Sequence, residues 1–119
     1  MLHIVSAGQF RKKGESVSKS DLLPGLKSIE KGDEPTLLVI PETVNLEAAV
    51  AGEIHVAMLS QCNNLQDRFA LLDITGGDKA PTPTPNPVND FRSNVGMNFI
   101  KFGAAYYPWI RTTLSFNID

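Results

Sequence analysis

The sequence predicts a single α/β domain over residues 1–119, with a mostly parallel sheet of about four strands and helices on both faces. Short apolar runs alternate along the chain with segments of helical periodicity. The apolar runs lack polar alternation, which is typical of strands covered on both faces. A chain of 119 residues is long enough for one hydrophobic core and too short for two ordinary domains.

The N-terminal part predicts a strand followed by a helix. Residues 2–5 are mostly apolar and the run stops at Gly8, so we expect a short buried strand here. After a polar loop, Ser18 or Ser20 can cap a helix whose leucines recur at helical spacing. Gly32 follows as a stop signal.

The middle of the chain predicts a second strand and the longest helix. Residues 36–40 form a continuous apolar run between two prolines, which favours a strand covered on both faces. A helix is then expected from its apolar positions, which keep a spacing of three and four: Leu46, Ala49, Val50, Ile54, Ala57, Met58, Cys62 and Leu65. Gly52 weakens this helix by about 1 kcal/mol relative to alanine.

The remainder predicts strand, loop, helix and strand. Residues 69–74 indicate a buried strand that ends at a glycine pair. Prolines at every second position of 78–87 predict an extended surface loop. A short helix is expected from Asn89 or Asp90 to Gly96, and a last strand over 104–114, where Pro108 favours a bulge or an edge position.

Composition argues against nucleic-acid and membrane partners. The net charge is -2 and the pI is about 5.6, so no basic stripe is available to neutralise phosphates. The basic cluster at residues 11–13 is expected to be an exposed loop. No apolar run approaches the roughly 18 residues that a membrane helix needs, and the N-terminus lacks the pattern of an export signal.

The sequence carries no recognisable catalytic, metal or cofactor motif. The ends of the predicted strands, where a parallel sheet usually binds ligands, hold Ser6, Gly8, Glu42, Asn45, Asp73, Gly76 and Gly77. Their spacing matches neither a phosphate loop nor a dinucleotide fingerprint. We therefore expect no enzyme activity and no cofactor. Two alternatives stay open: a flavodoxin-like small-molecule or nucleotide binder, and a hydrolase that uses Asp73 or Glu42.

Individual polar residues are expected to be structural. Cys62 is predicted to be a core residue, and His55 to lie on the flank of the long helix. Asp73 is expected to accept hydrogen bonds from a nearby loop or helix N-terminus, or to pair with Arg92. The aromatic cluster at 106–109 favours core packing or a protein interface.

These last residues carry a resemblance to a known family. Residues 103–110, Gly-Ala-Ala-Tyr-Tyr-Pro-Trp-Ile, resemble the most recognisable signature of tail sheath proteins from contractile phages and phage-like injection systems. Residues 69–74 and 90–96 resemble the preceding segments of that pattern. The upstream runs 4–8 and 33–45 resemble earlier strands of the same sheath core, so the resemblance covers nearly the whole chain.

The resemblance implies a structural subunit without a cofactor. Such subunits stack in helical rings around an inner tail tube and contract to drive that tube into a target cell. The implied partners are other sheath subunits and the tube protein. The implied location is a virion tail or an extracellular contractile particle, assembled in the bacterial cytoplasm.

The resemblance also directs attention to particular residues. Tyr106, Tyr107, Pro108 and Trp109 are expected to form a fold signature or a subunit interface, and Asp73, Phe91 and Arg92 to be supporting core positions. Because sheath proteins are several times longer, we expect this chain to be a fragment of a larger fold. A sheet cut at both ends exposes unpaired edges, so self-association is expected.

Overall fold

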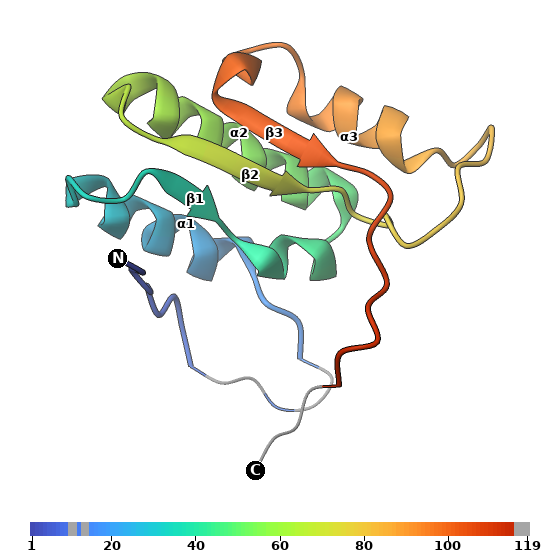
Figure 1. The fold of residues 1–119 in the computed structure, drawn as a ribbon, viewed down its shortest axis with the longest axis horizontal. Coiled ribbons are helices and arrows are strands. Elements are labelled where there is room, and N and C mark those ends of the chain that lie inside the picture. The colour runs from blue at the N-terminus through green and yellow to red at the C-terminus, as the bar shows by residue number, and fades with distance from the viewer. Residues whose placement is uncertain (10–11, 13–14, 116–119) are drawn as a thin grey trace.

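Three parallel strands form the centre of the structure, a computed structural model that describes residues 1–9, 12 and 15–115 (Figure 1). The elements are α1 (Lys19–Ser28), η1 (Ile29–Lys31), β1 (Leu37–Val39), η2 (Pro41–Asn45), α2 (Ala48–Leu65), β2 (Phe69–Asp73), α3 (Pro87–Val95), η3 (Ile100–Phe102) and β3 (Gly103–Tyr106). The predicted α/β class with a parallel sheet is therefore confirmed.

The strands lie side by side in the order in which the chain makes them, β1-β2-β3. Leu38 of β1 pairs with Ala70 of β2, and Ala70 pairs in turn with Gly103 of β3. Right-handed crossovers that always step in the same direction bring every connecting helix to the same side of the sheet. In Figure 1 α2 passes behind β2, with α1 on one side of it and α3 on the other.

This arrangement differs from the prediction, which placed helices on both faces of the sheet. Leu38 is buried, but its neighbours Leu37 and Val39 point to the opposite face and are 57% and 50% exposed. Helices reach both faces of a parallel sheet only where the strand order reverses, and the described strands contain no reversal. The apolar run at 36–40 is correctly predicted as a strand, but its coverage on both faces is wrong.

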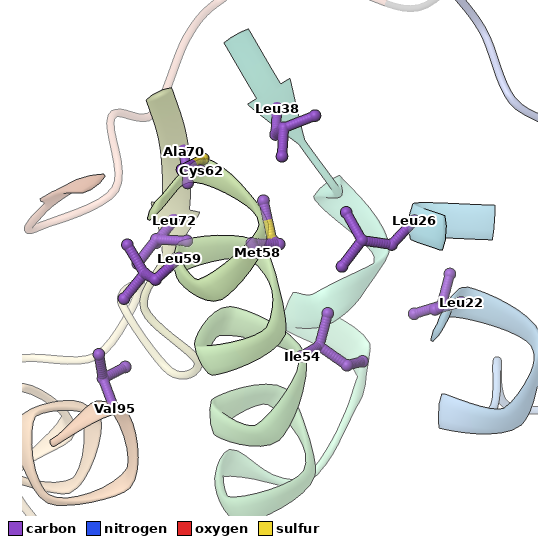
Figure 2. Packing of buried hydrophobic residues seen from close by; sticks show 10 residues of the cluster. All are labelled: Leu22, Leu26, Leu38, Ile54, Met58, Leu59, Cys62, Ala70, Leu72 and Val95. Atoms are coloured by element: carbon purple, nitrogen blue, oxygen red, sulfur yellow. The ribbon is translucent and has the colours of Figure 1, made fainter. Parts of the chain in front are cut away.

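The core lies between the sheet and α2 (Figure 2). Ile54, Met58 and Cys62 of α2 are almost completely buried, so the predicted core position of Cys62 is confirmed. Burying a large aliphatic side chain of this kind stabilises the fold by about 1.5 to 3 kcal/mol. The cluster is completed from both sides by Leu22 and Leu26 of α1, Leu38 of β1, Leu59 of α2, Ala70 and Leu72 of β2, and Val95 of α3.

The predicted first strand is absent. Residues 1–9 form no strand, and Leu2 and Ile4 are exposed. The side chain of His3 instead contacts the carboxylate of Glu34, with 3.1 Å between His3 Nε2 and Glu34 Oε2. A strand needs a hydrogen-bonded neighbour, which a short apolar run does not guarantee. The described part of the chain therefore contains three strands, where about four were expected.

The second half follows the prediction with shifted boundaries. The proline-rich segment is exposed from residue 78 to residue 85, as expected. α3 begins at Pro87, earlier than predicted, because the side chain of Asn86 accepts hydrogen bonds from two backbone N–H groups of the first turn. β3 ends at Tyr106, well before residue 114, since Pro108 has no N–H to donate to a ladder.

Arg68 joins the end of the first helix to the turn before β2. Its side chain is only 1% exposed. The guanidinium donates to the carbonyl oxygens of Ile29 at 3.1 Å and Gly32 at 2.7 Å, and Nε donates to Asp67 Oδ1 at 2.7 Å. These carbonyls end a helical segment, where backbone acceptors lack partners within the helix.

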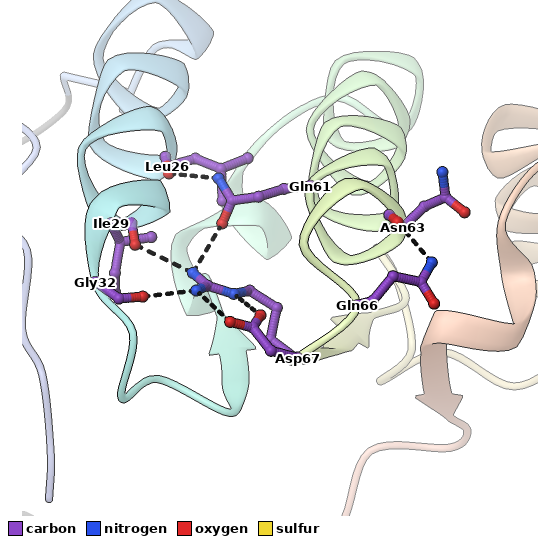
Figure 3. Close-up of polar contacts among 8 residues, drawn as sticks. Leu26, Ile29, Gly32, Gln61, Asn63, Gln66 and Asp67 are labelled. Carbon is purple, nitrogen blue, oxygen red and sulfur yellow. Dashed lines mark hydrogen bonds and ion pairs between the residues drawn. The ribbon is translucent and has the colours of Figure 1, made fainter.

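Gln61 extends the same network from α2. Its Nε2 donates to the Leu26 carbonyl at 2.8 Å, and its Oε1 accepts from Arg68 Nη1 at 3.5 Å. Figure 3 shows Gln61 facing the backbone of Leu26, with Ile29, Gly32 and Asp67 around the same hydrogen-bond network. The hydrogen bond from Arg68 holds the pKa of the Asp67 carboxyl below its ordinary value, so the pair stays charged at neutral pH.

Replacing Arg68 should destabilise the fold. We expect Arg68→Met to lower the free energy of unfolding by about 2 to 4 kcal/mol, because it removes the hydrogen bonds that Arg68 donates to the Gly32 carbonyl and to the buried Gln61 Oε1. Arg68→Lys should recover less than half of this loss, since one ammonium group cannot reproduce the planar fork. Urea denaturation measures both changes. The exposed Arg92→Met is the control and should change stability by less than about 0.5 kcal/mol; equal losses in both methionine variants would contradict this role of Arg68.

Candidate interaction surface

The aromatic signature residues, Tyr106 to Trp109, begin with the last residue of the edge strand β3. Tyr106 is the last residue of β3 and pairs with Asp73 of β2 in the sheet register. Its side chain is 74% exposed, and Pro108 is also exposed. Of the two interpretations of the aromatic cluster, core packing does not apply to Tyr106, which leaves the interface interpretation for this residue.

Tyr107 and Trp109 bind the loop that follows β2. Tyr107 Oη donates to the carbonyl oxygen of Lys79 at 2.7 Å. The backbone N–H of Trp109 donates to the carbonyl oxygen of Gly77 at 2.9 Å. The indole lies against Gly77 so closely that a Cβ atom there would come within 2.3 Å of Trp109 Nε1. Tyr107 and Trp109 thus hold the C-terminal segment against the carboxyl end of the sheet.

The three supporting positions have different surroundings. Phe91 of α3 is half-buried and packs against the core, as expected. Arg92 is exposed, so its predicted core role is wrong. Asp73 is half-buried, and among the described residues its side chain forms neither an ion pair with Arg92 nor a hydrogen bond.

A groove runs along the outer side of β1. It has a volume of about 690 Å³ and is bounded by the N-terminal segment 2–9, by α1 and by β1. Of the polar residues expected at strand ends, it brings together Ser6, Gly8 and Glu42. Asn45, Asp73, Gly76 and Gly77 lie outside its lining, so the groove does not bring together all the residues at the predicted strand ends.

Several large apolar side chains are exposed in β1 and in the C-terminal part of the chain. Leu37 and Val39 lie on the uncovered face of the sheet, and further exposed residues follow α3 and β3: Met97, Phe99, Ile100, Tyr106, Trp109, Ile110 and Leu114. Single exposed apolar residues are ordinary on a protein surface. Leu37 and Val39 lie on the same uncovered face of β1, where a neighbouring protein chain could cover them.

The other titratable groups are placed for structure. Burial raises the pKa of the Cys62 thiol, which favours the unreactive protonated form. His55 is buried in α2, so its predicted position on the helix flank is wrong. Within the described residues, no three His, Cys, Asp or Glu side chains are grouped so that they could hold a metal ion. None of the described helices has the length and apolar character needed to cross a membrane.

Sequence reasoning missed two buried polar residues that make specific contacts, Arg68 and His55. Arg68 precedes a predicted strand, where a charged residue ordinarily signals an exposed end. His55 did carry a usable signal, because it lies four residues after the buried Ala51 and three before Met58.

The contact between Trp109 and Gly77 leads to a prediction for the lone tryptophan. Gly77→Ala should displace the indole, shift its fluorescence to longer wavelength and lower stability by about 1 to 3 kcal/mol, because the added methyl group has no space. Gly8→Ala is the control, since its Cβ would make only ordinary contacts, the nearest at 3.8 Å. Unchanged emission in Gly77→Ala would refute the placement of Trp109.

Comparison with models of known protein families finds no match for the chain, and a search of characterised proteins finds no significant match either. The resemblance to tail sheath proteins therefore depends on the residues of this chain alone. Its strongest segment, 103–110, coincides with β3 and the aromatic residues that bind the loop after β2.

Proposed function

We propose that this chain is a structural subunit, or a fragment of one, of a contractile tail sheath. The observation that carries the proposal is the open face of the sheet, where Leu37 and Val39 are half exposed although they belong to an apolar strand. Leaving such side chains in water costs about 25 cal/mol for each Å² of apolar surface, which a neighbouring chain can recover.

The two outer strands support the same proposal. Neither the outer edge of β1 nor that of β3 is paired with another of the described strands. Free backbone N–H and C=O groups on an edge can pair with a strand of another chain. Open edges on both sides of one sheet suit a subunit with neighbours on two sides.

The proposed partners are other sheath subunits and an inner tail tube, within a virion tail or an extracellular contractile particle. Contraction of such an assembly is a repacking of rigid domains, which requires no cofactor in the subunit. The tightly packed core around α2 is consistent with a domain that moves as a unit.

The flavodoxin-like alternative has weaker support. Flavodoxin-like sheets bind their ligand where the strand order reverses, and β1-β2-β3 has no such point. The groove beside β1 is large enough for a small molecule. It is bounded mainly by apolar side chains of the N-terminal segment and α1, and it contains few polar groups that could orient a nucleotide.

Light scattering over a wide concentration range tests self-association. We expect the mean mass to rise with concentration, and the double variant Leu37→Lys, Val39→Lys to weaken association by at least about tenfold, because two charges would be buried at the contact. The control is Ala49→Lys, an exposed position on α2, which should associate like the original chain.

Two results would contradict the proposal. One is a sharp monomer at every concentration. The other is a reproducible rise in melting temperature with nucleotides or flavins, which would favour the small-molecule binder. The sheath assignment itself also predicts a tail tube gene next to the gene for this chain, and neighbours encoding only metabolic enzymes would count against it.

A further inference from the structure

The ring of His55 lies at the junction of three elements. It belongs to α2 and is 2% exposed. Its Nε2 lies 3.4 Å from Thr43 Oγ1 of η2, and its ring centroid lies 5.7 Å from that of Phe91 of α3, at an interplanar angle of 57°. The histidine therefore contacts an element on either side of α2.

These contacts determine which form of the ring fits. The Thr43 hydroxyl donates to the Ile40 carbonyl at 2.9 Å, so Oγ1 is left to accept from His55 Nε2–H. The other ring nitrogen, Nδ1, is buried and has no hydrogen-bond partner among the described residues. The site accepts a neutral ring that is protonated on Nε2, whereas an imidazolium would add a second N–H that lacks an acceptor.

The surroundings provide little compensation for a positive charge. His55 borders a cavity of only about 10 Å³, lined mainly by small and apolar residues of α2 and α3, with Thr75 and Asn94 as its polar members. Burial alone lowers the pKa of His55 from 6.5 to about 4. The titratable side chains on the surrounding elements take no part in that shift: Glu42, Glu53, Cys62, Asp73, Asp90 and Arg92.

We propose that His55 is an acid-sensitive latch, which keeps α3 packed on α2 while its ring is neutral and releases α3 when the ring is protonated. This inference is independent of the proposed function.

α3 is the element that should move. It has nine residues, and Val95 is its one buried residue, whereas α2 has eighteen residues, eight of them buried. It also follows the exposed proline-rich segment, which can change its path without disturbing the core. Gly52 lets the two helices approach closely, since a Cβ atom at Gly52 would lie 2.5 Å from Asn94 Cβ. A small displacement of α3 therefore opens the site of His55 to water.

The direction of the pH effect follows from the lowered pKa. The released state binds a proton on His55 near pH 6.5 and the packed state only near pH 4, so packing is fully stable above pH 6.5. It weakens as the pH falls between these values and levels off below about 4. The ratio of released to packed molecules should rise by up to about 300-fold across this window.

Amide hydrogen exchange of α3 relative to α2, corrected for the intrinsic pH dependence, tests the latch. In the original chain the opening of α3 should increase as the pH falls from 6.5 to 4 while α2 stays protected. His55→Phe, which keeps a ring but cannot titrate, should make α3 opening independent of pH in this range. His3→Gln removes the exposed histidine instead and should behave like the original chain.

The proposal is overturned if α3 exchange does not change with pH, if α2 opens together with α3, or if His55→Phe retains the acid sensitivity. Proton NMR of the original chain provides a second readout that does not depend on the folding of any variant. The His55 ring protons should titrate with a midpoint between about 4 and 6.5, which is higher the more α3 is released on protonation, and a midpoint at 6.5 would overturn the latch.

Discussion

The buried guanidinium of Arg68 is the interaction on which the arrangement of the N-terminal half depends. It reaches the carbonyl groups at the end of the first helical segment, the amide of Gln61 on α2 and the carboxylate of Asp67. A buried charge is tolerated only when it is paired and hydrogen-bonded, and both conditions are met here. α1 is thereby held against α2 at the level where β2 begins, which defines one wall of the core.

The sequential strand order explains the shape of the surface. Since each crossover steps in the same direction, the helices and the core collect on one side of the sheet. The opposite side keeps Leu37 and Val39 in contact with water. A surface of this kind suits the proposed contact with other chains, and the order of the three described strands has no point of reversal. Fold and proposed role are thus linked through a single topological property.

Much of the fold was predictable from the sequence, because the spacing of apolar residues and the positions of glycine, proline and capping residues indicate local structure. α1, α2, β1, β2 and the proline-rich loop were recovered in this way. The absence of a strand in residues 1–9 and the open face of the sheet were not predictable. An apolar run such as 36–40 shows that a segment is hydrophobic, but it does not show which neighbouring elements cover it. Arg68 was missed because its carbonyl acceptors lie more than thirty positions away in the chain. His55 was missed because packing from both sides widens the buried stripe of α2 beyond its most apolar positions.

The attachment of Trp109 and Tyr107 to the loop after β2 has a mechanical consequence. A force on the C-terminal segment meets the bond from the Trp109 N–H to Gly77 and the bond from Tyr107 to Lys79 before it reaches the ladder of β3. The pull is therefore shared with the end of the central strand and does not peel the edge strand away one hydrogen bond at a time. Tension at this end would be transmitted into the middle of the sheet, where it is resisted by strands on both sides.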